Sequence, residues 1–124
     1  MLRRYVMLGS INAGLSVALG AFGAHLLKSL LTPERMATWE TAVQYHMFHA
    51  LALLLIAIMA DRLNSPAKLL WAARLIWIGI IIFSGSLYIL CLSGKGVLGA
   101  ITPIGGVAFI AGWVMLALAA RRSS

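Results

Sequence analysis

The chain has 124 residues, of which 62% are hydrophobic and only 10% are charged, with a formal net charge of +7. Its mean hydropathy of +0.98 exceeds what a water-soluble domain of this size can bury in one core, so the composition excludes a soluble globular protein and predicts an integral membrane protein. The single cysteine, Cys91, excludes a disulfide within the chain.

Four apolar segments divide the chain. They occupy approximately residues 5–27, 43–60, 72–92 and 103–120. Each is close to the roughly 17–25 residues that a helix needs to cross the hydrocarbon layer. The connections between them are short and leave no room for a soluble domain. The sequence therefore predicts one all-α domain over residues 1–124, an integral membrane four-helix bundle.

The basic residues that flank these segments are unevenly distributed. With a cytoplasmic N-terminus, seven lie on the cytoplasmic side: Arg3, Arg4, Arg62, Lys68, Arg74, Arg121 and Arg122. Three lie on the outer side: Lys28, Arg35 and Lys95. Because cytoplasmic loops carry the excess of Lys and Arg, both termini are predicted to be cytoplasmic. The remaining effect of the charge is attraction to anionic lipid, and no nucleic-acid partner is predicted.

The first segment combines one intramembrane polar residue with a line of small ones. Asn12 is placed in the inner half of the membrane. Small side chains recur at spacings of four, three, four and three, at Gly9, Ala13, Ser16, Gly20 and Gly23. Such a line predicts a helix-packing face. The basic start also resembles a secretory signal, but the apolar run is longer than the roughly 7–15 residues of a signal core, which favours a membrane span.

The second segment begins with a capping signal. Thr32 is expected to cap the helix, and Pro33 takes the first helical position, where its missing N–H costs nothing. Apolar residues at spacings of three and four predict an amphipathic helical approach over residues 33–43, near the outer headgroups. Trp39 is assigned to the outer aromatic belt.

Two histidines, His46 and His49, stand where the apolar run of the second segment begins. At about 100° per residue, they share a face with small residues, whereas the opposite face carries bulky apolar ones. Small residues mark helix contacts in a membrane, so both imidazoles are expected to point into the bundle.

The third and fourth segments bring further polar side chains to the same depth. The third carries the stretch "FSGSLY", and the fourth starts with Thr102 and Pro103, which repeat the capping signal. The result is a candidate binding cluster in the outer half of the membrane, made of His25, Gln44, His46, His49, Ser84, Ser86, Tyr88 and Thr102.

Four stretches of the chain carry a family resemblance: "GAFGAHLLK", "WETAVQYHMFHALALL", "FSGSLYIL" and "ITPIGGVAFIAGW". Together they resemble the small bacterial inner-membrane family known as domain of unknown function 423, which is related to the animal transmembrane protein 256 family. The resemblance covers nearly the whole chain. It implies a multi-pass, four-helix protein of the bacterial cytoplasmic (inner) membrane, and no established activity, substrate or cofactor.

The candidate cluster supports two interpretations. In the first, the histidines bond to Ser84, Ser86 or Tyr88 and fix helix packing, and the chain is a structural or accessory membrane protein. Its partners are then the lipid bilayer and either further copies or a larger membrane complex.

In the second interpretation, the cluster binds haem, a metal, a quinone or a lipid, because neutral imidazole is a good metal ligand. His46 and His49 are three residues apart and cannot ligate opposite faces of one haem, so an axial pair would need His25. No CxxCH, HExxH or cysteine pair supports a metal site, and no resident cofactor or metal is predicted.

Catalysis is not predicted. The sequence has no G-x-S-x-G elbow and no phosphate-binding loop. Its carboxylates, Glu34, Glu40 and Asp61, lie at or beyond the membrane edges, whereas a proton pathway needs ionisable groups through the full thickness.

Overall fold

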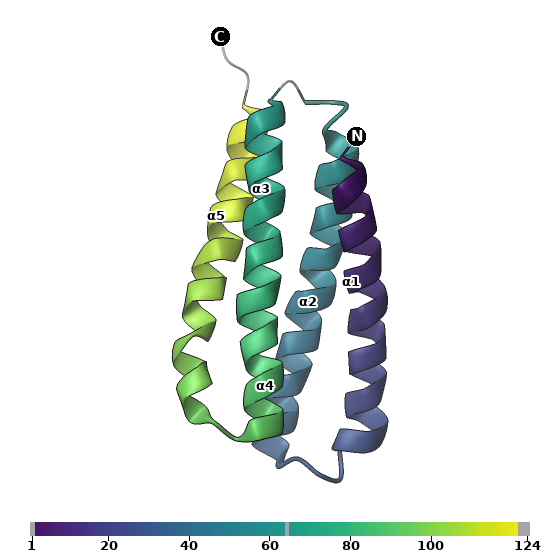
Figure 1. Ribbon diagram of the computed structural model, residues 1–124, viewed down its shortest axis with the longest axis vertical. Coiled ribbons are helices and arrows are strands. Elements are labelled where there is room, and N and C mark those ends of the chain that lie inside the picture. The colour runs from purple at the N-terminus through teal and green to yellow at the C-terminus, as the bar shows by residue number, and fades with distance from the viewer. Residues whose placement is uncertain (1, 64, 122–124) are drawn as a thin grey trace.

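The computed structural model describes residues 2–63 and 65–121, and the secondary structure of this part of the chain is helical (Figure 1). In chain order the elements are α1 (Arg3–Phe22), the π-helical η1 (Gly23–Leu27), α2 (Pro33–Met59), α3 (Pro66–Gly79), the π-helical η2 (Ile80–Ser84), α4 (Gly85–Ser93), the 3-10 helix η3 (Gly96–Ala100) and α5 (Thr102–Ala120). Arg122, which contributes to the charge bias, lies outside the described residues.

Within the described ranges, four stretches are long and apolar enough to cross a membrane: Arg3–Leu27, Pro33–Met59, Pro66–Ser93 and Gly96–Ala120. The prediction of an all-α, four-helix membrane protein is confirmed. The spans extend beyond the apolar segments predicted from the sequence, for example from Pro33 rather than residue 43 in the second span. The start of α1 and the end of α5 lie at the same end of the bundle, while their side of the membrane remains a prediction (Figure 1).

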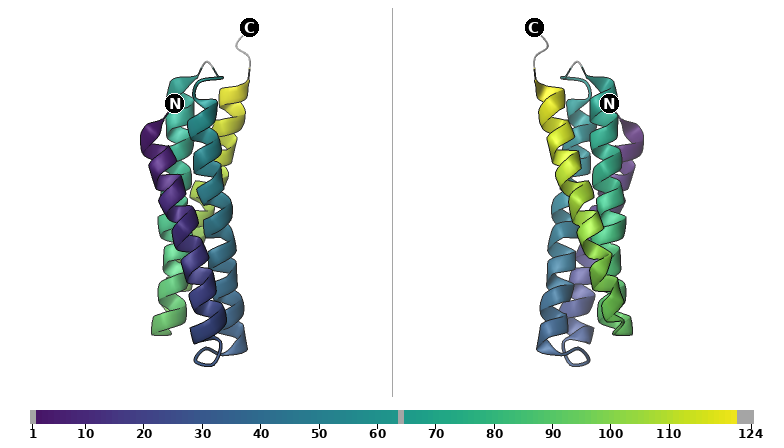
Figure 2. Two further views of the ribbon diagram at one scale, coloured as in Figure 1. Left: turned by 90° about the vertical axis from the view of Figure 1, so that its right-hand side faces the viewer. Right: turned by 90° about the vertical axis from the view of Figure 1, so that its left-hand side faces the viewer.

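The four spans are arranged with two in the centre and two on the flanks. α2 lies beside the continuous α3–η2–α4 helix, α1 packs along α2, and α5 packs along α3 (Figures 1 and 2). Accordingly, the α2 span is the most buried of the four, with 44% of an apolar 18-residue stretch inside the protein, against 22% for such a stretch of the α1 span. Side chains of α2 are therefore in reach of every other span.

The small residues of the first segment lie against α2. A Cβ atom at Gly9 would lie 2.9 Å from Leu54 Cγ and 3.0 Å from the Ala50 carbonyl oxygen. Near the other end of the contact, a Cβ atom at Gly23 would overlap the indole of Trp39. Three other small residues complete this line. Gly20 faces Val43, Ala13 is half-buried, and Ser16 is fully buried.

The second helix pair, α3–η2 with α5, also meets through glycines. Gly105 lies directly against the backbone of Phe83, and a Cβ atom at Gly112 would lie 2.8 Å from Ile76 Cδ1. Gly79 in turn makes room for the ring of Phe109. Close approach at these glycines sets the distance between the two helices.

Trp39 does not lie in an outer aromatic belt, so that prediction is wrong. Its side chain is only 2% exposed, and its indole N–H donates to the Leu19 carbonyl at 2.9 Å. The missing side chain of Gly23 leaves room for the ring, which also lies against Tyr88 with centroids 4.8 Å apart. Residues 33–43 thus form the first part of α2, which buries Trp39 and Ala42 in the bundle.

The two predicted helix caps have different outcomes. The Thr32 hydroxyl accepts a hydrogen bond from the Arg35 amide at 3.2 Å, as expected of a cap. Thr102 does not cap α5, because the preceding residue, Ile101, is already helical, and the Thr102 hydroxyl donates backwards to the Leu98 carbonyl.

Candidate functional site

The imidazole of His46 joins three helices. Its Nε2 lies 2.8 Å from Asn12 Oδ1 on α1, and its Nδ1 lies 2.9 Å from the Tyr88 hydroxyl on α4. The Asn12 amide nitrogen donates to the Leu8 carbonyl at 2.8 Å, which leaves Oδ1 as the acceptor. His46 Nε2–H therefore donates to Asn12, and the lone pair of Nδ1 accepts the Tyr88 hydroxyl.

Asn12 belongs to the same cluster as the histidines, although it was predicted in the opposite half of the membrane. Asn12 and His46 each lie near the middle of their helices, so a division into inner and outer halves separates two residues that are in contact. The sequence signal was present: an amide on an apolar segment needs a partner in the membrane.

His49 joins α2 to α5. Its Nδ1 lies 2.8 Å from the Tyr45 carbonyl, and the Trp113 indole N–H donates to its Nε2 at 3.0 Å. A carbonyl only accepts and an indole only donates, so the proton is on Nδ1 and the lone pair is on Nε2. The ring also stacks on Phe109, with centroids 3.6 Å apart and planes 11° from parallel. The sequence pattern did not identify Trp113 as a partner of His49.

The hydroxyl side chains form separate contacts. Ser84 donates to the Ala42 carbonyl of α2 at 2.9 Å. The hydroxyls of Ser86 and Thr102 lie 2.6 Å apart and link α4 to the start of α5. Of the three partners expected for the histidines, Ser84, Ser86 and Tyr88, the structure pairs only Tyr88 with a histidine.

In the π-helical turn η2, neighbouring side chains contact different helices. A π-helical turn holds an extra residue and so changes the angle at which successive side chains leave the helix. Within it, Ser84 reaches α2, whereas the ring of Phe83 lies 5.5 Å from that of Phe109 on α5. This turn lets one helix contact both of its neighbours at the same depth.

His25 and Gln44 lie outside the buried cluster. His25 is exposed on η1, and Gln44 is exposed on α2. An axial haem pair of His25 with either other histidine does not fit this arrangement, because the lone pairs of His46 and His49 are already bonded. In the part of the chain that the structure describes, no group of three or more His, Cys, Asp or Glu side chains could hold a metal ion.

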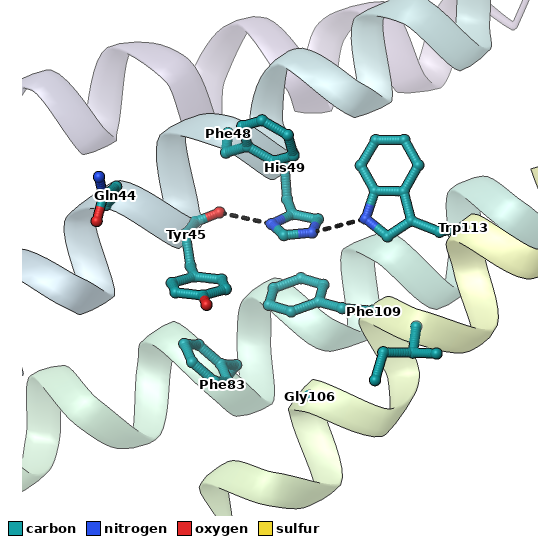
Figure 3. Close-up of a pocket in the computed structure, with 9 residues that line it drawn as sticks. Gln44, Tyr45, Phe48, His49, Phe83, Gly106, Phe109 and Trp113 are labelled. Carbon is teal, nitrogen blue, oxygen red and sulfur yellow. Dashed lines mark hydrogen bonds between the residues drawn. The ribbon is translucent and has the colours of Figure 1, made fainter.

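A groove of about 640 Å³ opens beside His49, between α2, η2 and α5 (Figure 3). Its lining residues are Gln44, Tyr45, Phe48, His49, Phe83, Gly106, Phe109, Ile110 and Trp113. Figure 3 shows Gln44 at one end and Trp113 at the other, with the rings of Tyr45, His49 and Phe109 between them. We call this the aromatic groove.

Residues 19–106 match the family described as "Protein of unknown function (DUF423)". The chain belongs to the DUF423 family. It is 50% identical over 116 residues to the UPF0382 membrane protein YwdK of Bacillus subtilis (strain 168), with 94% of each chain covered. It is 48% identical over 118 residues to the UPF0382 membrane protein SAB0533 of Staphylococcus aureus (strain bovine RF122 / ET3-1), with 95% of each chain covered. No solved structure matches the chain.

The family resemblance seen in four sequence stretches is thereby confirmed, and this DUF423 chain is a membrane protein. The family match includes His46, His49 and Tyr88, whereas Asn12 and Trp113 lie beyond residues 19–106. Because the names of the two DUF423 relatives state only that they are membrane proteins, the role of the cluster has to be argued from its geometry.

Proposed function

We propose that this protein is a structural or accessory membrane protein in which two neutral histidines hold the helices of the bundle together. The observation that carries the proposal is that both nitrogens of each imidazole are bonded within the protein. His46 bridges Asn12 and Tyr88, and His49 bridges Tyr45 and Trp113. Such bonds fix the rotation of α2 about its axis and its position relative to α1, α4 and α5.

The satisfied polar interior supports this role. Across residues 2–63 and 65–121, every buried side-chain nitrogen and oxygen has a hydrogen-bond partner. A site built to bind a ligand through buried polar groups commonly keeps some of them for that ligand. Here the buried groups serve one another, which is typical of polar residues that specify helix contacts in a membrane.

Ligation of haem or metal by the histidines is the less favoured alternative. A metal binds the lone pair of a neutral imidazole. In this structure the His46 lone pair accepts from Tyr88 and the His49 lone pair accepts from Trp113. Ligation would therefore break a bond between helices at each site. The proposal assigns no catalytic residue.

The test is the absorption spectrum and metal content of the protein purified in mild detergent, together with its thermal midpoint. We expect no Soret band, no stoichiometric metal and no effect of a chelator. His46→Gln and His49→Gln should lower the midpoint slightly, since an amide can still donate and accept, and His46→Leu and His49→Leu should lower it further. A chelator-sensitive midpoint or a Soret band would contradict the proposal, because a bound ligand would then contribute to folding.

A further inference from the structure

The aromatic groove brings together aromatic walls and side-chain hydrogen-bond donors. Six of its nine lining residues carry rings: Tyr45, Phe48, His49, Phe83, Phe109 and Trp113. Its volume of about 640 Å³ falls within the range of about 300–1,000 Å³ that is usual for small-molecule sites. The groove lies at mid-length of α2 and α5.

The groove is polar at one end and apolar at the other. Gln44 and Tyr45 lie nearer the start of α2, whereas Phe48 lies one turn further along the helix, with its ring centroid 5.9 Å from that of Trp113 on α5 (Figure 3). A ligand that fits this gradient has a polar ring or head at the first end and an apolar body along the second.

Two hydrogen-bond donors at the polar end are not used by the protein. Among the described residues, neither the Tyr45 hydroxyl nor the Gln44 amide makes a side-chain hydrogen bond, and Tyr45 is 43% exposed. The hydrocarbon layer offers no water to such groups, so a partner is worth more there than at an aqueous surface. A hydroxyl and an amide N–H both favour an acceptor, such as a carbonyl oxygen.

We infer that the aromatic groove binds a membrane-soluble ring compound with carbonyl oxygens, of the quinone class. The ring stacks among the aromatic side chains, and its carbonyl oxygen accepts from Tyr45 and Gln44. A phospholipid acyl chain fits less well, because it gains little by leaving other acyl chains for a groove lined by flat rings. The role of His49 is to orient Trp113 and Phe109 as walls of the groove, without contacting the ligand through a free lone pair.

The test uses tryptophan fluorescence with a decyl-tailed benzoquinone as the probe, on protein in lipid nanodiscs. Gly106→Leu fills the groove, since a Cβ atom at Gly106 meets only Phe83, at 3.9 Å, and the fold has room for it. Gly14→Leu is the matched control, because Gly14 is an exposed helical glycine on α1 with no neighbouring atom within 4 Å of its Cβ position.

We expect saturable quenching in the parent protein and in Gly14→Leu, and an affinity at least about tenfold weaker in Gly106→Leu. Tyr45→Phe, which keeps the ring, should weaken binding by about fivefold, the effect of one neutral hydrogen bond. This second variant keeps the test decisive if Gly106→Leu does not fold.

A second probe distinguishes the quinone from an ordinary lipid. A phospholipid with a brominated acyl chain quenches tryptophans that it touches. Equal quinone affinity in Gly14→Leu, Gly106→Leu and Tyr45→Phe would overturn the inference. A second combination of results would also overturn the inference: quinone quenching that never saturates, together with weaker quenching by the brominated lipid in Gly106→Leu. The groove would then hold an acyl chain.

Discussion

At the scale of single residues, the two histidines differ in which nitrogen carries the proton. His46 donates through Nε2 to an amide oxygen, whereas His49 donates through Nδ1 to a backbone carbonyl. Each keeps one lone pair, and each lone pair meets a donor that comes from another helix, Tyr88 or Trp113. Each imidazole therefore donates one hydrogen bond and accepts another, which explains why histidine suits these positions in an apolar helix.

The bond between Asn12 and His46 can be measured with a double-mutant cycle. Asn12→Leu and His46→Leu should each destabilise the protein, and the double variant should lose less than the sum of the two. The expected coupling is about 0.6 kcal/mol, the average for such bonds in membranes. The measurement is unfolding in detergent by a denaturant.

Its control is the pair Asn12→Leu and Ser86→Ala, because Ser86 bonds to Thr102 rather than to the histidine. That pair should be additive. Additivity of the Asn12 and His46 variants as well would show that the contact contributes nothing to stability.

The contact between His49 and Trp113 gives a second residue-level prediction. Trp113→Phe keeps an aromatic ring but removes the only donor to His49 Nε2 that the structure shows. We expect a loss of about 0.6 kcal/mol, and up to about 1.7 kcal/mol, in the free energy of unfolding. In His49→Leu protein the same substitution should have little further effect. An undiminished effect in the His49→Leu background would assign the loss to packing.

At the scale of helices, glycines decide how closely two spans approach. Gly105→Ala should destabilise the protein by about 1–3 kcal/mol, the usual cost of overpacking, because its Cβ would overlap the backbone of Phe83. Gly14→Ala should be neutral or slightly stabilising, because Gly14 faces open space and alanine favours a helix. Thermal midpoints in detergent test both. Equal midpoints for the two variants would mean that the helices can separate at Gly105 without cost.

Hydropathy and the pair Thr32 and Pro33 are sufficient to predict the four spans and the start of α2, because both depend on local sequence. The π-helical turn η2 could not be predicted, since it lies where one helix contacts both α2 and α5. The burial of Trp39 was missed for a related reason: the space for its ring is created by Gly23 on another helix. The pairing of Asn12 with His46 requires the relative height of α1 and α2, which a single sequence does not contain.

At the scale of the whole molecule, the placement of both ends of the bundle on one side agrees with an even number of spans (Figure 1). The charge bias predicts that this side is cytoplasmic. After Cys91→Ala, a cysteine at Ser65 should resist an impermeant thiol reagent in intact cells, and one at Ser93 should react. Lysed cells, in which both should react, provide the control. Labelling at Ser65 and protection at Ser93 would reverse the assigned orientation.

The position of α2 between its partners also has a consequence for synthesis. The chain emerges from the ribosome N-terminus first, and His46 follows Asn12 by 34 residues, so this partner is already in place when α2 is made. Tyr88 comes 42 residues after His46, and Trp113 comes 64 residues after His49. Until the last span is inserted, the His49 lone pair has no donor from that span. α5 is therefore the element whose arrival completes the polar interior, and a chain truncated before Trp113 leaves α2 with an imidazole nitrogen facing lipid.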